Sequence, residues 1–571
     1  MTSHRWPAAV VAASLLAAAC GGPTVSPAPG AATTPPPTPS PTAAGAPACR
    51  ARPTAAPATA AWWHDRVFYE VFVRSFADSD GDGIGDLRGL TERLDHLNDG
   101  DPTTSDDLGV TALWLMPVAE SPSYHGYDVT DYRRIEPDYG TQEDFIALVA
   151  AARERGIEIV VDLVVNHSSR EHPWFEASAA GDPAYADWYV WADERPPVSG
   201  PAGRPVWHQL GGRWYYGYFW EGMPDLDVSN DAVTAELDDI ARFWVDEMGV
   251  AGFRLDAARH LIEDGAELEN TPETFDWLRG FRERLQAVEP GALVLGEVWD
   301  ATSVASRYVR EGALDLAFEF GLASQILSAV RFGDPGSLAI VQAEVSAAYP
   351  VDGYAVFLTN HDQDRAFDVL GRDPAAARQA ATLLLTDPGI PFLYYGEEVG
   401  LRGRKPDERI RTPMPWTGEA PGYGFTSGTP WQAMADGVEA SNVAAQARSA
   451  DSLLSWYRQL IAARTAHPAL SGGRSIPLES AVAGVYATLR VDDADDEAVV
   501  VVSNLTDEPV GDVRLSLLSG PLCGSPTAAV LLGTDTGAVV AAPVVTAEGG
   551  LDGWSIGSLA PHGDVLVALR P

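Results

Sequence analysis

Eight short apolar runs, separated by stretches with helical spacing, constrain the fold of this chain more than any other feature. They occupy residues 67–76, 112–118, 157–166, 251–257, 292–299, 314–320, 354–362 and 389–398. Alternating strands and helices predict a parallel sheet, and eight such units are the number that closes a (β/α)8 barrel. We therefore predict an α/β fold built on a TIM barrel.

Polar residues stand at the carboxyl ends of five of these runs: Asn166, Asp256, Glu297, Asp362 and Glu397. In a (β/α)8 barrel the active site is built from the segments that follow the carboxyl ends of the strands. The pattern therefore predicts an active site that is rich in carboxylates at this end of the barrel.

Two further regions accompany the predicted barrel, which would comprise residues 61–167 and 229–470. Residues 168–228, rich in Trp, Tyr, Gly and Pro, are too long for one crossover and predict a domain inserted between strand 3 and helix 3. Its aromatic side chains would either stack on flat ligand rings or pack the core of the insert. Residues 471–571 contain alternating apolar runs and predict a C-terminal antiparallel β-sandwich.

The first twenty residues predict a secretory signal peptide, because His4 and Arg5 precede an apolar run that ends at Cys20. Small residues before this cysteine and two glycines after it are typical of a bacterial lipoprotein cleavage site. Acyl chains on Cys20 would tether the protein to a membrane; an Ala-rich signal peptide with an incidental cysteine is the alternative. Residues 21–60, rich in Pro, Thr and Ala, predict an extended linker, so we expect an extracellular, membrane-anchored lipoprotein.

Composition and charge restrict the partners of the chain. Its 571 residues are 46% hydrophobic and 21% charged, as in ordinary globular proteins, and its net charge is −41. Such an acidic surface repels nucleic acid and is compatible with a neutral polymer as substrate, so we expect no nucleic-acid partner. We also expect a monomer. Cys49 and Cys523 are available for one disulfide, and the sequence leaves their pairing open.

The segment "GFRLDAARH" (252–260) places Arg254 two residues before Asp256, on the same face of a strand. One interpretation is a structural ion pair; the other is a nucleophilic carboxylate whose pKa the cation holds down. Retaining cleavage of a glycosidic bond needs two carboxyl groups roughly 5–5.5 Å apart, and neighbouring strands would place Asp256 and Glu297 in this way. Apolar Val298 and Trp299 would raise the pKa of Glu297 and favour an acid/base role.

Five motifs with the expected order and spacing resemble the α-amylase superfamily of retaining α-glycoside hydrolases, glycoside hydrolase family 13, over about residues 62–571. They are "DLVVNH" (162–167), "MPDLD" (223–227), "GFRLDAARH" (252–260), "GEVWD" (296–300) and "FLTNHD" (357–362). The resemblance implies the barrel, inserted domain and C-terminal sandwich predicted above.

The resemblance also implies residue roles. Asp256 would be the nucleophile, Glu297 the acid/base and Asp362 the stabiliser of the transition state. The implied substrate-binding residues are Tyr124, His125, Tyr127, His167, Arg254, Arg259, His260 and His361.

The segment "DSDGDGIGD" (78–86) matches the first nine positions of an EF-hand loop, but Gly89 stands where the bidentate Glu is required. We therefore predict a Ca2+-binding loop that is not an EF-hand; a solvated acidic turn is the alternative. Members of the oligo-1,6-glucosidase side of the superfamily have a similar loop after the first strand. The predicted ligands are Asp78, Asp80, Asp82, Ile84 and Asp86.

Two positions bear on the bond that is cleaved. Ala257 stands where relatives that cut α-1,6 bonds usually have Val, and Tyr124 stands where exo-acting α-glucosidases carry an Asp that closes the pocket. Together with "RTPMPW" (411–416), they resemble the group intermediate between oligo-1,6-glucosidases and neopullulanases. We expect an α-amylase acting on starch and related α-1,4-glucans. An α-glucosidase or transglycosylase acting on malto-oligosaccharides and an inactive glucan-binding surface protein are the alternatives.

Overall fold

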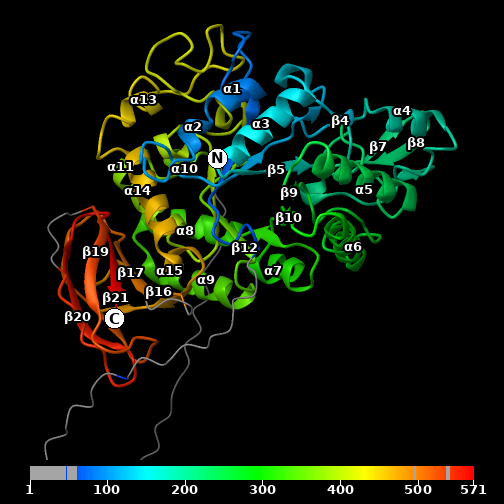
Figure 1. The fold of residues 1–571 in the computed structure, drawn as a ribbon. Helices are drawn as coiled ribbons and strands as arrows, with labels where there is room; N and C mark the ends of the chain where they lie inside the picture. Colours follow the sequence, from blue (N-terminus) through cyan, green and yellow to red (C-terminus); the bar gives the residue numbers. More distant parts are fainter. Residues whose placement is uncertain (1–46, 48–60, 493–496, 535–539, 571) are drawn as a thin grey trace, which may run out of the picture. The chain divides into compact units, whose positions relative to one another are not determined.

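Eight parallel strands close into a barrel in the computed structural model, which describes residues 47, 61–492, 497–534 and 540–570 (Figure 1). The strand order is β1-β13-β12-β11-β10-β9-β5-β2. Each strand lies within one of the eight predicted runs, so the predicted TIM barrel is confirmed. The strands are β1 (Phe68–Val71), β2 (Ala112–Leu115), β5 (Glu158–Leu163), β9 (Gly252–Leu255), β10 (Leu293–Gly296), β11 (Leu316–Phe318), β12 (Tyr354–Phe357) and β13 (Ile390–Tyr394).

Large aromatic side chains fill the inside of the barrel. Phe68 stacks on Phe392 with 4.3 Å between ring centroids, and Trp114 and Phe318 pack beside them. The strands are shorter than the apolar runs because the chain turns out of the sheet at their carboxyl ends. After β1 it forms the short helix η1 (Val73–Ser75), and after β13 it forms η4 (Glu397–Val399).

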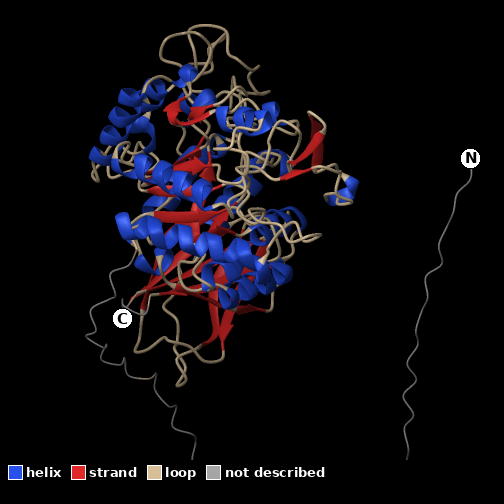
Figure 2. Ribbon diagram, turned by 90° about the vertical axis from the view of Figure 1, so that its right-hand side faces the viewer, coloured by secondary structure: helices blue, strands red, loops and turns tan. Residues whose placement is uncertain are grey.

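Helices surround the strands, as the blue and red ribbons of Figure 2 show. In α5 the buried residues Val233, Leu237 and Ile240 recur at helical spacing and face the barrel. The helices are α1 (Leu87–Glu92), α2 (Leu94–Leu97), α3 (Gln142–Glu154), α5 (Asp231–Asp246), α6 (Pro272–Val288), α7 (Thr302–Arg310), α8 (Phe320–Phe332), α9 (Pro335–Ala348), α10 (Ala366–Val369), α11 (Pro374–Leu385), α12 (Asp407–Ile410), α13 (Val443–Gln446), α14 (Leu453–Ala466) and α15 (Pro468–Ser471).

Between β5 and α5 the chain forms a small region with its own sheet. It contains α4 (Pro173–Ala180), η3 (Pro201–Gly203) and the strands β6 (Trp191–Ala192), β7 (Trp207–Leu210) and β8 (Arg213–Tyr216), in the order β6-β8-β7. Phe175, Trp191 and Tyr215 pack against one another, whereas Trp220 is 50% exposed. Several aromatic side chains of this insert therefore form its core. A separate pair, β3 (Ala119–Glu120) and β4 (Asp131–Ile135), precedes η2 (Pro137–Tyr139).

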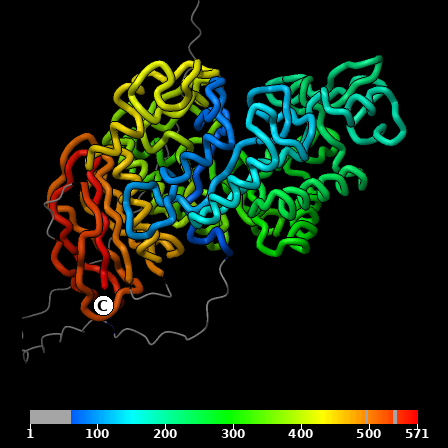
Figure 3. Tube along the Cα trace, turned by 45° about the horizontal axis from the view of Figure 1, so that its top comes forward, coloured from blue at the N-terminus to red at the C-terminus, as the bar shows by residue number. Residues whose placement is uncertain are grey.

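The C-terminal region consists of two antiparallel sheets, whose chain path can be followed in Figure 3. Apolar side chains such as Val500, Leu515 and Val567 form a core of their own. One sheet has the order β14-β16-β17-β21-β19, with β14 (Arg474–Pro477), β16 (Val485–Val491), β17 (Ala498–Asn504), β21 (Asp564–Arg570) and β19 (Thr527–Gly533). The other has the order β15-β18-β20, with β15 (Glu479–Ser480), β18 (Val510–Leu517) and β20 (Leu551–Leu559).

The predictions for the amino-terminal segments lie outside the described residues. These are the signal peptide, the linker and the lipidation of Cys20. Cys523 is disulfide-bonded, while Cys49, which the sequence offers as a partner, also lies outside them. None of the helices within the described ranges is long and apolar enough to cross a membrane.

Candidate active site

A single buried guanidinium group connects three carboxylates at the carboxyl end of the barrel. Arg254 lies in β9, between β5 and β10, and its side chain is 1% exposed. Its Nη1 donates to Asp162 Oδ1 at 2.7 Å and to Asp256 Oδ1 at 2.8 Å. Its Nη2 donates to Glu297 Oε2 at 2.8 Å. The two carboxyl groups predicted to catalyse are therefore fixed on the two terminal nitrogens of one side chain.

Burial raises the pKa of Asp256 to about 6, and the positive charge of Arg254 opposes that rise. The direction that we predicted from the sequence, a pKa held below the ordinary value, is wrong. Desolvation of the carboxylate outweighs the attraction of the cation, and the nearby charges of Asp162 and Asp362 add to the rise. At neutral pH the ionised form of Asp256 still predominates.

Burial also raises the pKa of Glu297, to about 7, in the direction predicted for an acid/base. Arg254 opposes this rise, and the charge of Asp256 reinforces it. Of the two apolar neighbours, Val298 is fully buried, whereas Trp299 stacks on Phe320 and is 45% exposed. The backbone NH of Ala257 also donates to Glu297 Oε2, at 3.3 Å.

Asp362 lies between two cations. His361 Nε2 is 3.2 Å from its Oδ2, and Arg411 Nη2 donates to its Oδ1 at 2.9 Å. Although burial alone would raise the pKa of Asp362, these two charges hold it well below the ordinary value. Burial lowers the pKa of His361, but Asp362 and Glu70 overcome this effect and raise it to about 9. Its Nδ1 donates to Glu70 Oε1 at 2.6 Å. Asp362 is therefore ionised throughout the neutral range.

Tyr127 joins the two groups of charges. Its hydroxyl donates to Asp162 Oδ2 at 3.0 Å and accepts from His361 Nε2 at 2.8 Å. Trp114 Nε1 also donates to Asp162 Oδ2, at 3.3 Å. The ring of Tyr127 therefore has a fixed orientation beside the catalytic carboxylates.

Sequence reasoning missed three side chains of this network, although each had a signal. Asp162 begins the motif "DLVVNH", and Arg411 begins "RTPMPW". Glu70 is a single acid inside the apolar run that became β1, where it is 2% exposed. An acid inside an otherwise apolar strand is a signal for a buried polar partner.

His167 is buried beside this network. Its Nδ1 donates to Asn166 Oδ1 at 2.9 Å, while its Nε2 has no hydrogen-bond partner among the described groups. Burial lowers the pKa of His167 to about 3, so the ring is neutral. Asn166 Nδ2 donates to the carbonyl of His260 at 2.6 Å, which joins the segments that follow β5 and β9.

Arg259 and His260 do not bond to the catalytic carboxylates in the described part of the chain. Arg259 pairs with Asp300 at 3.2 Å and Glu269 at 3.4 Å. The ring of His260 stacks on Tyr218 of the insert, with 4.0 Å between centroids. The structure therefore places His260 against the insert, whereas Arg259 connects the segments that follow β9 and β10.

Two further predicted substrate-binding residues form a row of rings with Tyr127. His125 stacks on Tyr127 at 6.1 Å, and Tyr124 meets His125 edge-on at 5.4 Å.

Glu397 does not bond to Arg254, Asp256, Glu297 or Asp362 in the described part of the chain, although it follows a barrel strand. Its Oε1 accepts from Tyr457 of α14 at 2.7 Å.

The acidic loop 78–86 brings together three of its four carboxylates. One oxygen from each of Asp78, Asp80 and Asp86 lies within 4.8 Å of the others. Asp82 is not part of this group; its Oδ1 accepts from the NH of Ile84 at 2.7 Å. The carbonyl of Ile84 as a ligand stays a prediction.

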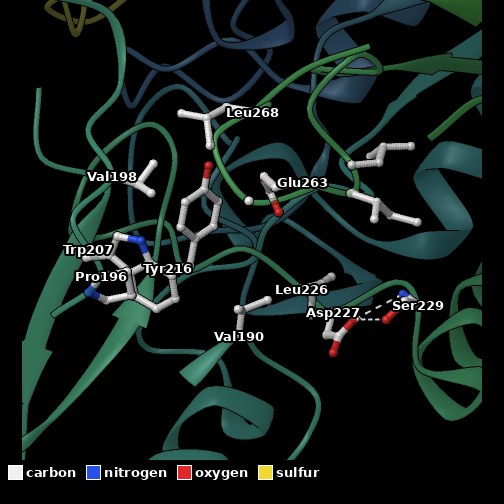
Figure 4. A pocket seen from close by; sticks show the side chains of 13 residues that line it. Val190, Pro196, Val198, Trp207, Tyr216, Leu226, Asp227, Ser229, Glu263 and Leu268 are labelled. Atoms are coloured by element: carbon white, nitrogen blue, oxygen red, sulfur yellow. Dashed lines mark hydrogen bonds between the residues drawn. The ribbon is translucent and has the colours of Figure 1, made fainter. Parts of the chain in front are cut away.

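A separate cavity of about 480 Å³ lies between the insert and the segment after β9 (Figure 4). Two carboxyl groups line it, those of Asp227 and Glu263, and burial raises the pKa of Glu263 to about 7. None of the catalytic carboxylates lines this cavity. Its walls are Val190, Pro196, Val198, Trp207, Tyr216, Leu226, Asp227, Ser229, Leu261, Ile262, Glu263, Gly265 and Leu268.

Comparisons with known proteins agree with this arrangement. The family model "Alpha amylase, catalytic domain" matches residues 70–473. Alpha-amylase 3 from Dictyoglomus thermophilum is 39% identical over 451 residues, covering 78% of this chain and 85% of that protein. The trehalose synthase/amylase TreS from Mycolicibacterium smegmatis is 34% identical over 519 residues, covering 79% and 86%.

Further matches are a glucosidase and a solved structure of an α-amylase. Glucan 1,6-alpha-glucosidase from Streptococcus pneumoniae is 30% identical over 508 residues, covering 78% of this chain and 92% of that protein. The crystal structure of the α-amylase from H. orenii has a TM-score of 0.77 and 38% sequence identity, covering 88% of this chain and 99% of that chain. By its family model and these relatives, and with the same barrel fold, the chain belongs to the α-amylase family, glycoside hydrolase family 13, and is an enzyme of that type.

Proposed function

We propose that the protein is an α-amylase that cleaves internal α-1,4 bonds of starch and related glucans with retention of configuration. The observation that carries this proposal is the pair Asp256 and Glu297 on the two terminal nitrogens of buried Arg254, with pKa values of about 6 and about 7. Between about pH 6 and pH 7, Asp256 is thus mostly ionised while Glu297 mostly holds its proton. This is the state in which retaining glycosidases begin their reaction.

In the first step Asp256 attacks the anomeric carbon of the glucose unit at the cleavage point. Arg254 holds its Oδ1, and Oδ2 is the oxygen that forms the bond. Glu297 gives its proton to the glycosidic oxygen, so that the departing chain leaves as an alcohol. The product of this step is a glucosyl ester of Asp256.

In the second step Glu297, now ionised, takes a proton from water. The water oxygen attacks the anomeric carbon from the face that the leaving group vacated, and the bond to Asp256 breaks. Two inversions give net retention. Asp362, ionised beside His361 and Arg411, stabilises the positive charge that develops on the sugar ring in both steps.

Two local features support cleavage of α-1,4 bonds inside a chain. Relatives that cut α-1,6 bonds usually have Val where this chain has Ala257. Ala257 has a φ of 50°, in the left-handed region, where a β-branched side chain such as Val would be strained. Tyr124 supplies an aromatic ring where exo-acting relatives would supply a carboxylate. The α-amylases among the relatives are also more similar in sequence than the trehalose synthase/amylase or the 1,6-glucosidase.

Transfer of the glucosyl unit to a sugar is the second candidate, because trehalose synthases are among the relatives. Chromatography of the products from starch, pullulan and maltose separates the two. Malto-oligosaccharides of mixed length released early from starch support the amylase. Trehalose or longer oligosaccharides made from maltose would favour the transferase.

The first prediction concerns the two catalytic carboxyl groups. Asp256→Asn removes the nucleophile, and Glu297→Gln removes the transferable proton. We expect each to lower kcat on starch by about a thousandfold or more. Circular dichroism and the melting temperature provide the control for folding. A folded variant that keeps a tenth of the wild-type activity would contradict the assignment.

The second prediction is a bell-shaped pH profile. Asp256 must be ionised, so activity falls as the pH drops below about 6; Glu297 must be protonated, so it falls as the pH rises above about 7. The profile of kcat/KM on maltoheptaose provides the measurement. On an aryl α-glucoside with an acidic phenol, which needs little proton donation, the fall above pH 7 should be weaker. An acidic limb near the ordinary aspartate value of about 4 would contradict the raised pKa of Asp256.

We also propose that the loop 78–86 binds Ca2+. Its three clustered carboxylates provide an all-oxygen set of ligands, as Ca2+ prefers. The loop also reaches the active-site side of the barrel, because η1 precedes it directly. Calcium there would stabilise the loop rather than take part in bond cleavage.

The third prediction tests this calcium site with a matched pair of variants. Excess chelator should lower the melting temperature of the wild type by about 3 °C or more, because a bound ion stabilises only the folded state. Asp80→Asn should abolish this response. Asp82→Asn, in the same loop but outside the cluster, should keep it. An unchanged wild-type melt, or the same loss in both variants, would contradict the site.

We further propose that the enzyme is extracellular and anchored through a lipidated Cys20. This proposal rests on the sequence of residues 1–20 alone, and a monomeric state likewise remains a prediction. In a bacterial host that processes lipoproteins, we expect the wild type in the membrane fraction and Cys20→Ala outside it. The same distribution for both proteins would contradict the anchor.

A further inference from the structure

An aromatic pair lies across the barrel from the acid/base. Tyr124 and Trp431 stack with 5.4 Å between ring centroids and an angle of 29°. Trp431 contacts η1, which directly follows β1, whereas Glu297 follows β10. In the closed strand order, β1 and β10 are four positions apart in either direction, which is the opposite side of an eight-stranded barrel. Since Glu297 faces the departing chain, the pair lies on the other side of the cleavage point.

A row of side chains connects this pair with the catalytic residues. Tyr124 meets His125, which stacks on Tyr127 beside the cleavage point. The guanidinium of Arg411 lies over the ring of Tyr124, 6.0 Å from its centre, and the same guanidinium bonds to Asp362. The pair therefore begins one side chain away from Asp362.

The ring of Trp431 is fixed on several sides while remaining half-buried. Its Nε1 donates to Ser75 Oγ at 3.1 Å, and Phe72 meets the ring edge-on at 6.0 Å. The guanidinium of Arg74 lies 5.4 Å from its centre. A ring that is already immobilised loses little conformational entropy when a ligand stacks on it.

The acidic loop 78–86 holds the segment that carries Trp431. The NH of Trp431 donates to the carbonyl of Gly83 at 2.8 Å, and the NH of Asp78 donates to the carbonyl of Phe425 at 2.9 Å. Gly83 has a φ of 98°, and a Cβ at this position would lie 1.9 Å from the carbonyl oxygen of Thr429. The two segments approach as closely as they do because this residue is glycine.

We propose that Trp431 is a specificity-determining residue. Together with Tyr124 it supplies the aromatic surface that contacts the glucose unit on the non-reducing side of the one at the cleavage point. The loop 78–86 positions this surface through Gly83 and Asp78. The inference rests on the proposed action on α-glucans. One face of a pyranose ring consists of C–H groups, and such a face packs on an aromatic ring.

The test compares a long substrate with one that lacks the stacked unit. Maltoheptaose can place glucose on Trp431, whereas p-nitrophenyl α-glucoside has a single glucose and puts its aryl group on the side of Glu297. We expect Trp431→Ala to lower the ratio of kcat/KM values, maltoheptaose over aryl glucoside, about fivefold or more. Trp431→Phe, which keeps a ring, should retain most of the ratio.

Trp62→Ala provides the matched control. Trp62 is also half-buried, but it packs on Phe68 at the amino end of the barrel, away from the catalytic carboxylates. It should leave the ratio at the wild-type value. Equal losses on both substrates in Trp431→Ala, or no loss on either, would overturn the proposal.

Binding gives a second readout that does not depend on turnover. In Glu297→Gln protein, calorimetry should show weaker binding of maltoheptaose when Trp431 is replaced by Ala, about fivefold in Kd. If the wild type cleaves no starch, the proposed function fails while this comparison still decides the role of Trp431; equal Kd values would overturn it. Gly83→Ala, which displaces the segment, should reproduce the binding loss, and normal binding in this folded variant would contradict the positioning role.

Discussion

The rest of the site depends on the ion pairs of buried Arg254. A charge without solvent is costly unless it is paired, and this guanidinium is paired with Asp162, Asp256 and Glu297. Three carboxylates around one cation would carry excess negative charge if all were ionised. A proton in this cluster is therefore favourable, and Glu297, with the pKa of about 7, holds it. The charge balance around one arginine thus gives Asp256 and Glu297 together the protonation states that the proposed nucleophile and acid require.

The neighbouring cluster has the opposite balance. Asp362, Glu70 and Asp407 are three carboxylates, and His361, Arg411 and Lys405 are three cations, so no proton is needed to neutralise them. This is why the pKa of Asp362 is lowered although burial alone would raise it. The two clusters meet at Tyr127, which bonds to Asp162 and His361. Three acids of similar chemistry therefore differ in pKa because each has different partners.

Much of this could be predicted from the sequence, and the failures have physical reasons. The eight strands follow from the apolar runs, and the acids at their ends correctly indicate that Asp256, Glu297 and Asp362 lie at the carboxyl end of the barrel. The direction of the pKa shift of Asp256 does not follow, because a spacing of two residues reveals the cation but not the depth of burial. Glu397 follows a barrel strand as Asp362 does, yet its side chain accepts a hydrogen bond from Tyr457 of α14. This contact depends on how the helices pack. Asp82 alternates with Asp78 and Asp80, but the folded loop brings Asp86 rather than Asp82 to these two carboxylates, and the alternation alone does not reveal this.

The central claim is that Asp256 forms a covalent bond to the sugar while Glu297 moves the proton. The most direct test is to trap this intermediate with a fluorinated α-glucosyl fluoride, whose glycosyl ester breaks down slowly, and to map the labelled peptide by mass spectrometry. The account predicts one added glycosyl group on Asp256 and none in the Asp256→Asn variant. A label on Asp162 or Asp362, or no label together with products of inverted configuration, would contradict it.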